Sequence, residues 1–292
     1  MKISILIPVY NDWESVSELI KNINIEIKDL NHEFSVIIIN DASLEKKELN
    51  FQSLENINLI ELIHMKENRG HARCIASGLK YIFEKKDFDY IIPMDGDGED
   101  RPSEIKNFVE YIEYSPNQTI VGERVKRSEN FFFKFCYNIH KFLTFFFTGQ
   151  SIKFGNYTCL TIATVEKMVN EQASWNSFSG SLTKVEKNRK SIPSIRGTRY
   201  FGPSKMSFIN LLKHSFAIIS VFKMNVLIRS VLFLIIYSFL ILDNISTVTL
   251  IPIPVVLILN VIFFKLAKRE SLEEYKNCLD NIQNISDLKK NN

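Results

Sequence analysis

Short apolar runs alternate along the first hundred residues with longer segments of mixed polarity. Each run has the length of a buried strand and ends at a polar turn or a proline. In the longer segments, apolar positions such as Ile75, Leu79 and Ile82 share one helical face. The predicted strands are residues 3–7, 34–39, 58–64 and 90–94, and the predicted helices are residues 13–28 and 71–84. This alternation predicts an α/β fold with a doubly wound, mostly parallel sheet.

The turns that follow these strands are polar and contain Tyr10, Asp41 and Asp95. Parallel strands end at the same edge of a sheet, and open α/β sheets bind ligands there. We therefore expect these three residues to gather at one edge. Asp12 follows the first turn and is a candidate N-cap for the next helix.

Asp95-Gly96-Asp97 places two carboxylates beside one small residue at the end of a predicted strand. Carboxylate oxygens suit Mg²⁺ or Mn²⁺, which bridge protein carboxylates and substrate phosphates. A solvated turn has the same pattern, so this motif alone is weak evidence.

The chain becomes almost entirely apolar from Val226 to Leu266. Residues 226–242 and 247–266 each have about the length of a membrane-spanning helix. Lys and Arg flank this pair, and the link between the two segments has none. The positive-inside rule then predicts a multi-pass protein of the cytoplasmic membrane, with both termini and the catalytic domain in the cytoplasm. A buried helical hairpin in a soluble protein is the alternative.

Residues 129–148 contain many phenylalanines with interspersed lysines. Aromatic and cationic residues on one helix favour the membrane interface over a plain core helix, and such a helix could guide a lipid into the site. We expect a catalytic domain at 1–212, a juxtamembrane segment and two transmembrane helices at 213–268, and a polar tail at 269–292 that forms a surface helix with a frayed end.

The composition excludes several classes of function. The net charge of +3 and the lack of a basic reader motif argue against nucleic-acid binding. The four cysteines are scattered without a C-x-x-C pair, which argues against a disulfide framework or a zinc site. The five histidines have no metal-ligand spacing.

Four motifs in order resemble those of family 2 glycosyltransferases with the GT-A fold. They are Ile7-Pro8-Val9-Tyr10-Asn11, Asn40-Asp41-Ala42-Ser43, Asn68-Arg69-Gly70 and Met94-Asp95-Gly96-Asp97. The resemblance implies that these turns bind a UDP- or GDP-linked sugar and a Mg²⁺ or Mn²⁺ ion. Pro8, Tyr10 and Asp41 would line the nucleoside pocket with Arg69 nearby, and Asp95 and Asp97 would hold the metal on the diphosphate. In the alternative interpretation, Pro8 and Asp41 merely end strands.

Further motifs resemble the dolichyl- and polyprenyl-phosphate sugar synthases within that family. They are the acidic stretch Asp97-Gly98-Glu99-Asp100-Arg101-Pro102, the segment Val121-Gly122-Glu123-Arg124, and residues 199–208 with Arg199, Ser204 and Lys205. The last segment is implied to bind the donor phosphates, Arg as a fork and Lys as a point charge. A solvated basic loop is the alternative. The resemblance implies inverting transfer to a lipid-linked acceptor, with polyprenyl phosphate as the expected one.

Asn156 departs from the pattern of those synthases, which often carry an aspartate that is a candidate base in the matching segment. An amide cannot accept a proton at neutral pH. A hydroxyl acceptor needs a base, whereas a phosphate monoester is already largely ionised. We expect Asn156 to position a substrate, unless Glu99 or Asp100 supplies the base.

Two other functions stay open from the sequence. One is sugar transfer to a hydroxyl of a glycan or glycolipid in cell-surface polysaccharide synthesis. The other is an inactive GT-A-like binding or scaffold protein, against which the intact Asp95, Asp97, Arg199 and Lys205 argue. A homo-oligomer is compatible with either.

Overall fold

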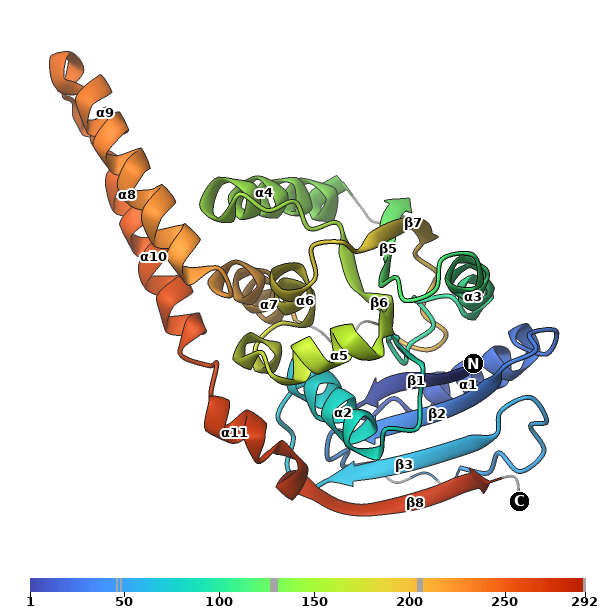
Figure 1. Cartoon of the computed structure of the whole chain (residues 1–292). Helices are drawn as coiled ribbons and strands as arrows, with labels where there is room; N and C mark the ends of the chain where they lie inside the picture. Colours follow the sequence, from blue (N-terminus) through green and yellow to red (C-terminus); the bar gives the residue numbers. More distant parts are fainter. Residues whose placement is uncertain (46, 48, 127–130, 204–206, 291–292) are drawn as a thin grey trace.

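A mixed sheet forms the centre of the molecule in a computed structural model of the chain (Figure 1). The structure describes residues 1–45, 47, 49–126, 131–203 and 207–290. Within these residues eight strands form one sheet in the order β7-β5-β6-β4-β1-β2-β3-β8. The strands are β1 (Lys2–Val9), β2 (Glu33–Asn40), β3 (Leu59–Met65), β4 (Tyr90–Pro93), β5 (Ile120–Lys126), β6 (Phe154–Thr161), β7 (Lys190–Ile195) and β8 (Ile282–Lys290).

The centre of the sheet is parallel, as the sequence predicts. β1 pairs in parallel with β2 and β4, and β2 pairs in parallel with β3. β6 runs antiparallel to both β4 and β5, while β7 is parallel to β5. The expected doubly wound, mostly parallel sheet is therefore confirmed, with antiparallel pairs toward its edges.

Helices cover both faces of the sheet because successive strand residues point to opposite sides. Ile3, Ile5 and Ile7 of β1 pack with α1 (Trp13–Glu26) and α3 (Ile105–Tyr114). Leu6 faces the other layer, formed by α2 (His71–Lys85), α5 (Ile162–Val169) and α6 (Phe178–Val185). The predicted shared face of α2 is confirmed, since Ile75, Leu79 and Ile82 are all buried.

Two apolar helices project from the body as a hairpin, drawn in orange in Figure 1. They are α8 (Lys223–Leu240) and α10 (Pro252–Ala267), joined through a short 3-10 turn, Leu242–Asn244, and α9 (Thr247–Leu250). By length and composition, the helical stretches Lys223–Leu240 and Thr247–Lys276, the second of which contains α9 and α10, could cross a membrane, and only 11% of each apolar window is buried inside the molecule. A core helix of a soluble protein would be mostly buried, so the alternative of a buried hairpin does not describe this pair.

The base of the hairpin packs on α4 (Phe131–Thr148) and α7 (Phe208–Ser220). Phe147 of α4 and Phe263 of α10 meet edge to face with ring centroids 5.0 Å apart. Arg229 of α8 donates from Nε to the carbonyl of Phe146 at 2.6 Å. This bond satisfies a carbonyl in the last turn of α4.

The tail differs from the sequence prediction. A surface helix is present only as α11 (Leu272–Lys276), and the expected frayed end instead forms β8, antiparallel to the edge strand β3. Tyr275 of α11 is 2% exposed and stacks on Trp175 at 5.6 Å between ring centroids. The strand was missed because its residues are mostly polar, as an exposed edge strand allows.

Candidate active site

The turns after β1, β2 and β4 gather at one edge of the sheet, as predicted. The backbone N–H of Asp41 donates to the carbonyl of Val9 at 2.9 Å. The side chain of Asn11 accepts the N–H of Leu44 at 2.8 Å, so the first two turns are joined directly.

Glycine is required on both sides of Asp97 by the packing of this edge. A Cβ on Gly96 would lie 2.9 Å from Val16 Cγ2 and 3.1 Å from the carbonyl oxygen of Pro8. Gly98 has φ +88°, and a Cβ there would lie 2.5 Å from the ring of Tyr200. The tight turn thereby holds the two carboxylates at a fixed separation against the end of β1.

Asp95 lies in a cluster with Asn156 and His71. The amide nitrogen of Asn156 donates to Asp95 Oδ1 at 3.1 Å and lies 2.8 Å from His71 Nε2. His71 Nε2 is 3.2 Å from the same Asp95 oxygen. Asn156, on β6, therefore contacts one of the two candidate metal ligands directly.

Asp97 is held by a different set of groups. Arg199 donates from Nη1 to Asp97 Oδ2 at 2.9 Å, and its Nη2 pairs with Asp12. Asp97 Oδ1 accepts the N–H of Glu99 at 3.0 Å. Asp12 stands at the N-cap of α1 but makes no capping hydrogen bond through its side chain: its Oδ1 accepts the hydroxyl of Ser15 at 2.8 Å, and its Oδ2 pairs with Arg199.

The two candidate bases are both engaged. Glu99 forms an ion pair with Arg196. Asp100 is 6% exposed, and its Oδ2 accepts the backbone N–H of Asp95 at 2.9 Å. In this arrangement Asp100 shapes the turn that carries Asp95.

The carboxyl groups of this acidic cluster have pKa values shifted in opposite directions. Burial opposes the ionisation of Asp95, but His71, the hydrogen bond from Asn156 and the charge of Arg124 together outweigh burial and hold the pKa of Asp95 below its usual value. Burial, followed by the charge of Asp95, raises the pKa of Asp97 to about 6. The same two causes raise the pKa of Asp100.

The donor set fits a metal that is shared with a substrate. In the described part of the chain, no three His, Cys, Asp or Glu side chains are grouped to hold a metal by themselves. Asp95 and Asp97 offer two hard carboxylates, and Mg²⁺ is commonly bound by one or two carboxylates plus substrate phosphates. These residues therefore suit a divalent ion held jointly with a diphosphate.

Asp41 anchors the Asn68-Arg69-Gly70 turn. Its two carboxylate oxygens accept the backbone N–H groups of Arg69 and Gly70, each at 2.9 Å. Asp41 is 5% exposed, and burial raises its pKa against these two bonds. A role for Asp41 in nucleoside binding stays a prediction, alongside this role in holding the loop.

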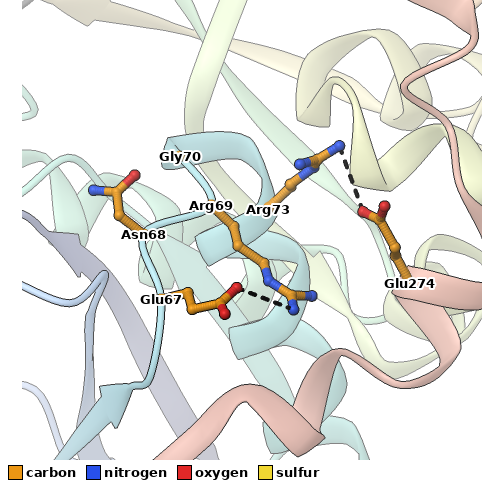
Figure 2. A pocket seen from close by; sticks show the side chains of 6 residues that line it. All are labelled: Glu67, Asn68, Arg69, Gly70, Arg73 and Glu274. Carbon is orange, nitrogen blue, oxygen red and sulfur yellow. Dashed lines mark ion pairs between the residues drawn. The ribbon is translucent and has the colours of Figure 1, made fainter.

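An open pocket of about 470 Å³ lies beside that turn, at the start of α2 (Figure 2). Two arginines line it, each paired with a glutamate. Arg69 lies 3.7 Å from Glu67, and Arg73 lies 3.6 Å from Glu274 of α11. The tail therefore reaches the neighbourhood of the candidate nucleotide site.

Two further predicted site residues, Pro8 and Tyr10, lie at the end of β1. Pro8 is buried within β1 and pairs in register with Ile39, and Tyr10 is 43% exposed directly after β1. Ser204 and Lys205 lie outside the described residues. Arg199 contacts Asp97, and its expected role at the diphosphate stays a prediction.

Three residues at this site were not predicted to act there. The sequence predicts His71 only as the start of a helix, Arg124 only as part of a motif, and Asp12 only as a cap. The charge of Arg124 acts on both Asp95 and Asp100, and its guanidinium fills the space beside Gly155. Basic residues directly after the turn at 68–70 and at the end of β5 were the available signals.

Solved structures with a similar fold include glucosyl-3-phosphoglycerate synthase from Mycobacterium tuberculosis. Its complex with Mn²⁺, UDP-glucose and phosphoglyceric acid has a TM-score of 0.53 and 11% identity, over 77% of this chain and 79% of that one. Its complex with Mn²⁺, UDP and phosphoglyceric acid has a TM-score of 0.54 and 11% identity, over 77% of this chain and 78% of that one. At this identity the likeness shows the GT-A fold alone.

S. aureus TarS aligns at a TM-score of 0.47 and 13% identity over 79% of this chain, and the alignment spans 42% of the length of TarS. A sequence profile described as Glycosyl transferase family 2 matches residues 4–173, which is more than half of the chain. The chain therefore belongs to glycosyl transferase family 2.

Proposed function

We propose that this glycosyltransferase is anchored in the membrane and moves a sugar, with inversion, from a UDP- or GDP-linked donor to polyprenyl phosphate. The observation that carries the lipid-linked acceptor is the exposed apolar hairpin, whose base packs against α4 and α7. An acceptor with a long apolar chain must be bound where its chain can stay in the bilayer.

The geometry of the strand ends supports the proposed donor site. Asp95 and Asp97 would hold Mg²⁺ or Mn²⁺ on the diphosphate, and Arg199 lies next to them. The metal would neutralise negative charge on the departing nucleoside diphosphate. The M. tuberculosis synthase is described with Mn²⁺ and UDP-glucose in one complex, which supports testing this pair first.

The acceptor would attack the anomeric carbon through a phosphate oxygen. The new bond forms between that oxygen and the carbon, while the bond to the donor diphosphate breaks and the nucleoside diphosphate leaves. A phosphate monoester is largely ionised at pH 7, so no base is required. Asn156 cannot serve as a base, and Glu99 and Asp100 are both engaged in other contacts.

The same proposal divides the chain between the cytoplasm and the membrane. The catalytic domain would lie in the cytoplasm, with α4 as the interfacial helix and α8 and α10 as the spans. Phe142 and Phe145 of α4 are 63% and 58% exposed, while Phe147 on the opposite side is buried. Such a helix suits the boundary between water and lipid.

The proposal is tested by measuring sugar transfer by the purified full-length protein in detergent. Radiolabelled UDP- and GDP-sugars would be incubated with polyprenyl phosphate and Mn²⁺ or Mg²⁺. We expect a lipid-soluble product that mild acid releases, because a glycosyl phosphate is acid-labile. A product stable to mild acid, formed on a glycan or glycolipid hydroxyl, would instead establish the alternative acceptor. The engagement of Glu99 and Asp100 argues against that outcome.

A further inference from the structure

Arg199 joins two carboxylates that are far apart in the sequence. Its Nη1 lies 2.9 Å from Asp97 Oδ2, and its Nη2 pairs with Asp12. The three side chains are only 15–19% exposed, so water screens these charges less than at an open surface. The ion pair between Arg199 and Asp97 therefore contributes more stabilising free energy than an ordinary surface ion pair.

The backbone around Arg199 is fixed to the same turn. The N–H of Tyr200 donates to the carbonyl of Asp97 at 2.9 Å, and the N–H of Gly197 donates to the carbonyl of Glu99 at 2.8 Å. The ring of Tyr200 covers Gly98. The backbone of Arg199 is thus fixed beside Asp97, and only its side chain is able to change partners.

A metal held by Asp97 would compete with Arg199 for the same carboxylate. Asp97 Oδ1 accepts the Glu99 N–H, and Oδ2 is held by Arg199. A divalent ion arriving alone must displace a cation that is already paired. A metal that arrives with a diphosphate offers Arg199 a new anionic partner at the same moment.

We propose that Arg199 is the resting counter-ion of Asp97, and that Asp12 is a positioning residue that retains Arg199 when the metal takes Asp97. This inference rests on the proposed function in assigning Asp97 to the metal and in placing the donor diphosphate beside Arg199. Two results follow: the metal binds weakly without the nucleotide, and Asp12 lowers the cost of releasing Asp97, because Arg199 never loses its second carboxylate.

The experiment is a titration of the full-length protein in detergent with Mn²⁺, read by the EPR signal of free Mn²⁺, with and without UDP or GDP. Arg199→Gln should tighten Mn²⁺ binding about five- to tenfold in the absence of nucleotide, since the competing cation is gone. With the nucleotide it should weaken Mn²⁺ binding, because the diphosphate loses a partner. Arg196→Gln is the matched control. It removes a charge that also acts on Asp97 but pairs with Glu99.

Asp12 is tested by a double-mutant cycle, which isolates its action through Arg199. Asp12→Asn should weaken Mn²⁺ binding about threefold or more in the unaltered background. In the Arg199→Gln background the same change should have less than a twofold effect. Asp12→Glu, which restores the charge, should recover most of the loss.

Four outcomes would overturn the inference. Equal effects of Arg199→Gln and Arg196→Gln on Mn²⁺ affinity would show that both arginines act through a general electrostatic field. Arg199 would then not compete with the metal for Asp97. An equal effect of Asp12→Asn in both backgrounds would separate Asp12 from Arg199. Tight nucleotide-independent Mn²⁺ binding by the unaltered protein would remove the counter-ion role, yet leave the proposed function intact. Failure of every variant to bind Mn²⁺ with either nucleotide would instead reject the metal assignment of the proposed function, and the inference with it.

Discussion

At the residue scale, Asp95 and Asp97 are identical side chains in opposite electrostatic settings. His71 and Asn156 support the negative charge on Asp95. Asp97 is partly buried and lies near that charge, and both effects raise its pKa to about 6 despite Arg199. Without metal, ionised Asp97 therefore opposes folding. Two carboxylates that repel each other are suited to a cation that binds both.

Asp97→Asn tests whether Asp97 holds a metal ion. Loss of the anionic ligand should lower turnover by about 10²-fold or more, since a bound metal contributes several kcal/mol to the transition state. Product formation from radiolabelled donor measures this. Transfer at a near-normal rate would reject the metal role of Asp97.

The same variant should behave differently in thermal unfolding. A carboxyl with a raised folded pKa contributes stability below its unfolded pKa, near 4, and loses that contribution as pH rises through about 6. In EDTA, the unaltered protein should therefore lose stability between pH 4 and pH 7 relative to Asp97→Asn, by about 1–3 kcal/mol. Parallel unfolding profiles for the two proteins would contradict the raised pKa.

Asn156→Ala removes an amide that donates to Asp95 at 3.1 Å. The side chain of Asp95 should then lose its fixed orientation, while no proton-transfer step is lost. We expect KM for donor or acceptor to rise about tenfold, with a smaller fall in kcat. Steady-state kinetics with each substrate varied in turn would measure both. A loss confined to kcat would point to a direct part for Asn156 in the chemical step.

At the element scale, the sequence predicts an element correctly where adjacent residues carry its pattern, and fails where the element depends on distant partners. The strands at the centre of the sheet are continuous apolar runs between turns, so their positions follow from the sequence. β8 is polar and acquires its structure only by pairing with β3. The ion pair between Asp12 and Arg199 joins residues 187 positions apart, and no local pattern predicts such a contact. The edge that carries the site was predictable, whereas the partners of its carboxylates were not.

The contact between α11 and the segment before α6 gives a test at this scale. Tyr275 stacks on Trp175, and its hydroxyl donates to the carbonyl of Met168 at 3.2 Å. Tyr275→Ala should destabilise the protein by about 3–5 kcal/mol through the lost ring and the cavity. Tyr275→Phe keeps the ring and should cost only about 1 kcal/mol. Thermal unfolding of both variants in the same detergent compares them, and an equally small effect would mean that the tail is not docked here.

At the scale of the whole molecule, the apolar hairpin is tied to the catalytic sheet at both ends. α7 leads into it, and α11 and β8 return from it to the sheet edge (Figure 1). Lys223 at the start of α8 lies 3.4 Å from Glu270 beyond α10, so the two ends of the hairpin are adjacent. A simple truncation at residue 226 would also remove β8, and would confuse loss of the anchor with loss of a strand.

A cleaner variant replaces residues 226–266 with a short Gly-Ser linker and retains α11 and β8. The full-length protein should resist carbonate extraction, because two apolar helices would remain in the bilayer. The variant should be released only in part, since the exposed Phe142 and Phe145 of α4 would still bind the membrane surface. Adding Phe142→Ser and Phe145→Ser to the variant should complete the release. If the full-length protein is instead monodisperse without detergent, the hairpin is not a membrane anchor, and a lipid-linked acceptor loses its main support.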